Sequence, residues 1–227
     1  MALRVLYLGI EAELRIDLNQ IEDACYALFE LYGKRNAIVS IDKVFCTRVV
    51  VYGSNYEIRL FIQRTTGNAL ISIVMSFDSS ESRSSYSAVQ RISTIFEETF
   101  STISKFSREF GKVRIYVKSF FRLPTSKIPE LAEELRKLGI ALTRAESRDL
   151  EENSMYVLSG IHVDPGLKVY EISIIAISRN IPLAEATMTV STTSNSKSVC
   201  QDLVSLIGMS RALLELIVNA IYGGSNP

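Results

Sequence analysis

The sequence predicts an α+β protein made of two tandem β-α-β(3-4)-α repeats, with an antiparallel sheet that carries helices on one face. Three observations predict it: matching apolar stripes of two helices, matching strand patterns after them, and a long closing helix in each half. The predicted repeats span 1–111 and 112–227 and pack as one pseudo-twofold unit. Of 227 residues, 47% are hydrophobic, which is enough to bury a core.

The first helix of each half is predicted from apolar residues at alternating spacings of three and four. They are Ile21, Ala24, Leu28 and Leu31 in the first half, and Ile128, Leu131, Leu135 and Leu138 in the second. Gly33 and Gly139 follow, where a residue in the left-handed conformation commonly ends a helix. Agreement of spacing and helix end favours duplication over chance similarity of two α+β halves.

Strands are predicted after each of these helices. Segment 39–52 is rich in β-branched and aromatic residues and holds either two short strands or one strand with a bulge. Its counterpart is 155–163. The next strands begin at Tyr56 and Tyr170. Because the connections are too short for crossovers, we expect antiparallel meanders.

Strand alternation assigns side chains to two faces of the sheet. The face predicted to meet the helices is apolar, comprising Ile58, Leu60, Ile62, Ile71, Ile73, Met75 and Phe77, and in the second half Tyr170, Ile172, Ile174, Ala184, Ala186, Met188 and Val190. The opposite face mixes small hydroxyls, charges and a few aromatic rings. It is either a solvated face or a recognition surface.

Each half closes with a serine-rich segment and a long helix, and the last helix is the more apolar of the two. Excess apolar surface indicates burial between the halves or against a second chain. We therefore predict a partner interface at Leu203, Leu206, Leu213, Ile217 and Ile221. Segment 203–222 is long enough to span a bilayer, but Arg211 and Glu215 interrupt it, so no membrane partner is expected.

Little in the sequence indicates catalysis. The 25 basic residues balance 25 acidic ones, so no net field favours nucleic acid. Cys25, Cys46 and Cys200 have no ligand-like spacing and are predicted to be buried apolar side chains in a cytoplasmic protein. His162 lies near Asp164 with no nucleophile nearby. We predict no catalytic residues, metal ligands or cofactors; phosphate binding by the serine-rich helix starts is a weaker alternative.

Two tandem repeats of strand, helix, antiparallel meander and long helix resemble the TATA-box-binding protein fold. Leu8-Gly9, leading through 14–18 into a helix, is similar to the first-strand-to-helix region of that family. The resemblance covers nearly the whole chain in topology and implies a possible saddle-shaped sheet. The family's Phe-Pro-Gly segment and wedging phenylalanines are missing from this sequence, so its DNA-binding residues are not carried over.

Three functions follow as hypotheses. The leading one is a non-enzymatic binding or assembly protein that engages a protein partner or a second copy of itself. The first alternative is nucleic-acid binding on the open sheet face, through Arg59, Phe61, Arg114, Tyr116 and Lys118. The second is a small-molecule binder or enzyme with a cleft between the repeats. Neutral charge favours the protein partner, and duplicated topology favours nucleic acid.

Overall fold

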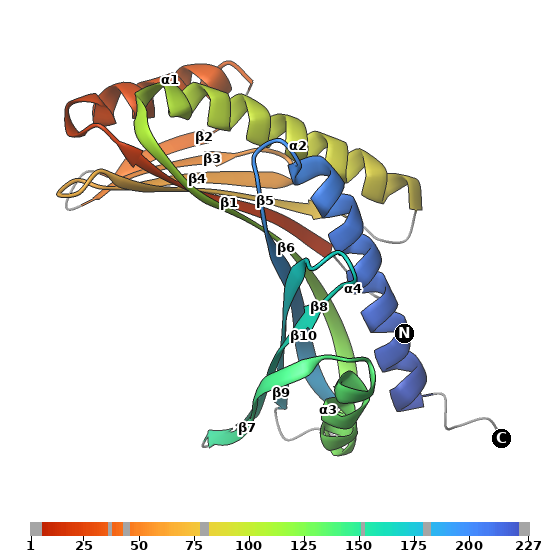
Figure 1. Cartoon of the computed structure of the whole chain (residues 1–227). Coiled ribbons are helices and arrows are strands. Elements are labelled where there is room, and N and C mark those ends of the chain that lie inside the picture. The colour runs from red at the N-terminus through yellow and green to blue at the C-terminus, as the bar shows by residue number, and fades with distance from the viewer. Residues whose placement is uncertain are drawn as a thin grey trace. The chain divides into compact units, whose positions relative to one another are not determined.

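The computed structural model describes residues 6–35, 38–42, 46–77, 82–150, 153–178 and 183–222 (Figure 1). A strand, a helix, four strands and a helix follow one another twice, which confirms the predicted fold class. The elements are β1 (Leu6–Ile16), α1 (Ile21–Gly33), β2 (Ile38–Asp42), β3 (Cys46–Tyr52), β4 (Tyr56–Gln63), β5 (Asn68–Phe77), α2 (Ser82–Ile103), β6 (Ser107–Pro124), α3 (Ile128–Lys137), β7 (Ala141–Leu150), β8 (Asn153–Val163), β9 (Val169–Ser178), β10 (Leu183–Ser194) and α4 (Val199–Tyr222).

In the described part of the chain, ten strands form a sheet in the order β2-β3-β4-β5-β1-β6-β10-β9-β8-β7. The chain divides into two compact units. The N-terminal unit comprises Tyr7–Ile115 and Thr193–Leu203, and the C-terminal unit is mainly Tyr116–Thr192 with most of α4. The repeat boundary between 111 and 112 stays a prediction, because β6 contributes residues to both units.

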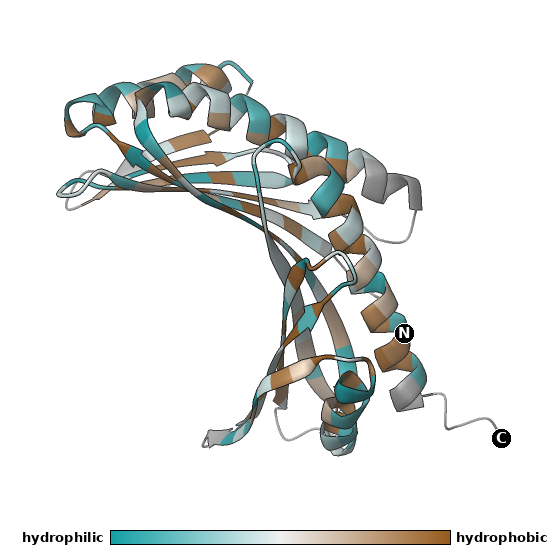
Figure 2. Ribbon diagram, in the orientation of Figure 1, coloured by the Kyte–Doolittle hydropathy of each residue, from teal (hydrophilic) through white to brown (hydrophobic). Residues whose placement is uncertain are grey.

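Both predicted helix-facing sets are buried. Ile58, Leu60 and Ile62 of β4 are fully inaccessible, and so are Ile71 and Ile73 of β5. In the N-terminal unit, α1 and α2 cover this face of the strands, and the strand ribbons alternate between apolar and polar residues (Figures 1 and 2). The alternation leaves the other face of the strands open for a site.

A buried hydroxyl cluster joins the two helices of the N-terminal unit. The Tyr32 hydroxyl lies 2.7 Å from Thr99 Oγ1 and donates to the Ile95 carbonyl at 3.2 Å. Nearby, the Arg35 guanidinium donates to the Glu98 carboxylate at 2.8 Å. Burial raises the pKa of Tyr32 to about 12. The phenol therefore stays protonated in the folded chain at pH values where it ionises in the unfolded chain.

We expect Tyr32→Phe to lower the free energy of unfolding by about 1 kcal/mol at pH 8, because it removes one net hydrogen bond. A raised folded-state pKa stabilises the fold fully below the unfolded pKa of about 10, and this contribution is lost as pH rises through about 12. The wild-type advantage should therefore shrink above pH 10. Urea denaturation of wild type and Tyr32→Phe at pH 8 and pH 11 measures this difference in the free energy of unfolding. The same difference at both pH values would contradict the explanation.

In the C-terminal unit, α4 lies against the sheet, with the buried Ser119 hydroxyl of β6 at 3.2 Å from the Ser210 hydroxyl of α4. β7 pairs with β8 and forms one end of the strand order given by the described residues. It carries the ion pairs of Arg144 and Arg148 with Glu146, at 2.7 and 3.1 Å. Such charges suit an edge strand because they oppose pairing with another chain.

The structure settles or corrects several local expectations. Segment 39–52 holds two strands, β2 and β3. Gly139 has a positive φ of 76°, as predicted, but Gly33 is the last helical residue and Lys34 after it is right-handed, so that prediction was wrong. Cys25 is buried, whereas Cys200 is exposed on α4, contrary to expectation. Among the described residues, no helix combines the length and apolarity that crossing a membrane requires.

Candidate functional site

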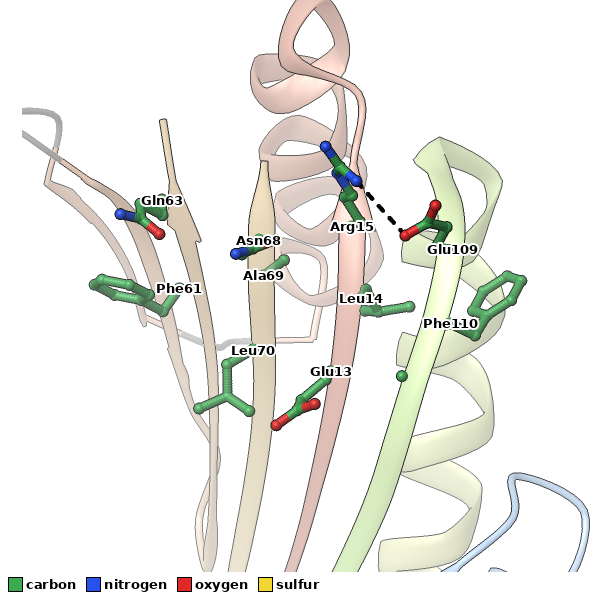
Figure 3. Close-up of a pocket in the computed structure, with 11 residues that line it drawn as sticks. Glu13, Leu14, Arg15, Phe61, Gln63, Asn68, Ala69, Leu70, Glu109 and Phe110 are labelled. Atoms are coloured by element: carbon green, nitrogen blue, oxygen red, sulfur yellow. Dashed lines mark ion pairs between the residues drawn. The ribbon is translucent and has the colours of Figure 1, made fainter. Parts of the chain in front are cut away.

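An open hollow of about 540 Å³ lies in the N-terminal unit, on the sheet face opposite α1 and α2 (Figure 3). It is lined by Glu13, Leu14, Arg15, Phe61, Gln63, Asn68, Ala69, Leu70, Glu109, Phe110 and Gly111. These residues come from β1, β4, β5 and β6. Most of them form two rows that cross the strands: an inner row of Phe61, Leu70, Glu13 and Gly111, and an outer row of Gln63, Asn68, Arg15 and Glu109.

The inner row follows from strand register. Phe61 of β4 is directly opposite Leu70 of β5. The next strand, β1, contributes Glu13, and Gly111 of β6 lies against it, since a Cβ atom at Gly111 would be 2.7 Å from the Glu13 Cβ. A glycine at the end of the row leaves space beside Glu13 that a side chain would fill.

The outer row is held by contacts at the ends of the strands. The Ile16 N–H donates to the Gly67 carbonyl at 2.8 Å, which fixes β1 against the start of β5. Antiparallel continuation from that bond places Arg15 beside Asn68. On the other side of β1, the Arg15 guanidinium lies 3.7 Å from the Glu109 carboxylate. Figure 3 shows this ion pair at the rim of the hollow.

Side-chain alternation shifts by one residue along β6. Glu109 and Gly111 lie on the same face as Arg15 and Glu13, whereas Val113 and the following odd-numbered residues of β6 are buried, and Ser119 among them contacts α4. A shift of alternation by one residue is the pattern that a β-bulge produces, and bulges are common beside active sites. The Phe110 ring lies 5.6 Å from the Phe100 ring of α2, which fixes this part of β6 against the helix.

The lining has a net charge of −1, because it holds two carboxylates and one guanidinium. Arg15 and Glu109 pair with each other. Among the described residues, neither Glu13 nor Glu11, its neighbour on the same face of β1, forms an ion pair. The negative charge of the hollow is therefore concentrated on β1.

The residues predicted to bind nucleic acid lie on two strands, β4 and β6, that are not neighbours in the sheet. On β4, Arg59 donates to both oxygens of Glu57, at 2.6 and 3.0 Å, and Phe61 lines the hollow. Because the carboxylate neutralises the guanidinium, Arg59 is a poor phosphate contact.

On β6, the predicted contacts are similarly engaged. Arg114 is exposed, but Tyr116 is only 6% exposed and the Lys118 ammonium lies 5.0 Å from the centre of its ring. Further along the strand, Arg122 pairs with Glu185 at 3.3 Å. The nucleic-acid hypothesis stays a prediction that this arrangement of charges does not favour.

Most of the residues predicted to form a partner interface are buried within the fold of the chain itself. Leu203 and Leu206 are fully inaccessible, and Leu213 and Ile217 are buried. The side chain of Ile221 lies outside the described residues. These apolar residues of α4 thus belong to the chain's own core, and among the described side chains of α4 the large apolar ones that are exposed are Val204 and Leu216.

The weaker candidates from the sequence, the serine-rich helix starts and His162 with Asp164, form contacts within their own segments where the structure describes them. Ser194 and Ser198 both donate to the Asp202 carboxylate, at 2.6 and 3.1 Å, so negative charge already sits where a phosphate would bind. The side chains of the first serine cluster lie largely outside the described residues. Asp164 accepts the Lys168 N–H at 2.8 Å within its turn, and His162 lies beside the Tyr170 ring.

Sequence reasoning missed Glu13, Arg15, Leu70 and Gly111 as site residues. One signal was available for Gly111: a glycine inside a strand pattern indicates a bulge or a close backbone approach. The carboxylates of β1 carried no such signal, because a charged residue on the open face of a strand is ordinarily solvated.

Fold and site together define an α+β sheet protein with an open, negatively charged hollow in its N-terminal unit. No family model and no curated protein matches the chain. The solved structures that match include one described as "Crystal structure of the di-domain ARO/CYC StfQ from the steffimycin biosynthetic pathway". It covers 96% of this chain and 99% of its own, with 7% identity and a TM-score of 0.23. Similarity at that level carries no argument about function.

Proposed function

We propose that this protein is a small-molecule binder whose site is the hollow of the N-terminal unit. The observation that carries the proposal is the hollow itself, since about 540 Å³ falls within the range of ligand pockets. This site lies within one unit, whereas the sequence hypothesis of a ligand site located it between the repeats.

Two exposed apolar side chains form the floor that would bind the ligand. Phe61 is 43% exposed and Leu70 is 38% exposed, and they are cross-strand neighbours. Removing adjacent apolar surface from water is favourable by about 25 cal/mol per Å². The apolar part of the ligand is therefore expected to lie across β4 and β5.

Polar groups at the rim would orient the ligand. Gln63 and Asn68 offer amide donors and acceptors beside the Arg15–Glu109 pair. The carboxylates, the guanidinium and the side-chain amides of the lining support reversible binding through charge and hydrogen bonds.

Phe61→Ala tests the proposal against a matched control. We expect it to weaken binding of the neutral probe 4-phenylbutan-1-ol about fivefold, because truncation removes about 1 kcal/mol of apolar contact. Phe120→Ala is the control, since Phe120 is a similarly exposed phenylalanine, 37%, on β6 in the C-terminal unit. Amide-shift NMR titration gives both dissociation constants. Equal weakening by the two variants, or no saturable binding to wild type, would refute the proposed site.

A further inference from the structure

We propose that the ligand of this hollow is an elongated organic cation, with a protonated amine at one end and an apolar ring or chain at the other. This inference rests on the proposed function and names the chemical class that the charges and spacing select.

The position of the amine follows from the charges along β1. Glu13 lines the hollow without an ion-pair partner among the described residues, and Glu11 follows on the same face. The guanidinium of Arg15 is paired with Glu109 and leaves Glu13 uncompensated. A cation beside Glu13 gains attraction to both β1 carboxylates, whereas an anionic ligand would be repelled by them.

The apolar end belongs on the opposite side of the hollow. Phe61 and Leu70 supply the exposed apolar surface there. Arg48 of β3 is directly opposite Phe61, so a second cation at that end would meet like charge. The inner row therefore has a negative pole at its β1 end, formed by Glu13, and an apolar pole at its β4 end, formed by Phe61. Arg48 is the cation next to the apolar pole.

Strand spacing sets the length of the ligand. β4 and β1 are separated by β5 alone, so Phe61 and Glu13 are two strand spacings apart. Neighbouring strands lie about 4.8 Å apart, which puts the two poles about 10 Å apart. An arylalkylamine with a four-carbon linker is about long enough to reach from one pole to the other, while benzylamine is too short.

Three probes of equal length test the charge preference: 4-phenylbutylamine, 4-phenylbutan-1-ol and 4-phenylbutyrate. We expect the amine to bind wild type about fivefold more tightly than the alcohol, and the carboxylate about fivefold more weakly, as for one exposed ion pair. Benzylamine should bind more weakly than 4-phenylbutylamine. Because these charges are exposed, 0.5 M NaCl should reduce the amine preference.

Glu13→Gln should abolish the amine preference while leaving the affinity for the alcohol unchanged. Glu30→Gln is the control, because Glu30 is an exposed carboxylate on α1. Equal binding of all three probes to wild type, an amine preference that survives Glu13→Gln, or one that high salt does not reduce, would overturn the cation inference while the proposed function stands. If no probe, the alcohol included, shifts the amides of the hollow, the proposed function itself fails.

Discussion

Gly67→Ala is expected to lower the free energy of unfolding by about 3 kcal/mol, because the change combines an unfavourable backbone conformation with a steric clash. Gly67 has a φ of +72°, and an added Cβ would lie 2.2 Å from the Ile16 carbonyl oxygen. The obstacle is backbone, so no side-chain rotation relieves it. The same residue accepts the Ile16 N–H, which fixes β1 against β5.

Gly139→Ala is the matched control for this prediction. Gly139 has a similar φ of +76°, but an added Cβ would meet nothing within 4 Å. Its cost is expected to be about 1 kcal/mol, the intrinsic penalty of the left-handed conformation. Urea denaturation followed by circular dichroism compares the two. Equal losses of stability in the two variants would show that the close contact between residue 67 and the Ile16 carbonyl contributes nothing. The register at the end of β1 would then be held by other contacts.

Gly111→Ala is expected to weaken binding of 4-phenylbutylamine about tenfold, because it fills the space beside Glu13 and displaces that residue. An added Cβ would lie 2.7 Å from the Glu13 Cβ and 3.2 Å from its carbonyl oxygen. Since both atoms are fixed to the backbone of β1, strand β6 must shift. We expect an accompanying stability loss of about 1 to 2 kcal/mol.

The control for the pocket prediction is Gly208→Ala, where an added Cβ in α4 meets nothing within 4 Å. It should leave the dissociation constant unchanged. Binding is measured at a temperature where circular dichroism shows both variants folded, so that affinity and stability are separated. Wild-type affinity in folded Gly111→Ala would place the ligand away from Gly111.

Much of the fold could be predicted because its signals are local. Alternation in β4 and β5 identified the buried residues from Ile58 to Phe77, and three-and-four spacing identified α1 and α3. β7 gave no such signal, because its charged sequence is that of an edge strand. Gly33 was misjudged, since α1 ends on a right-handed residue with no need of glycine.

The site could not be predicted because it depends on long-range register. Glu13, Leu70 and Gly111 are far apart in sequence and meet only when β1 lies between β5 and β6. Contacts such as the hydrogen bond from the Ile16 N–H to the Gly67 carbonyl hold β1 in that place. Burial of Leu203 and Leu206 by their own chain, rather than by a partner, likewise required the tertiary structure.

The most direct test of the proposed site is the location of the amides that shift when wild-type protein is titrated with 4-phenylbutan-1-ol. Binding in the hollow predicts saturable shifts concentrated in residues 13–15, 61–63, 68–70 and 109–111. Saturable shifts that map instead to β8 and β9 of the C-terminal unit, or no saturation at millimolar probe, would contradict the assignment of the hollow as the ligand site.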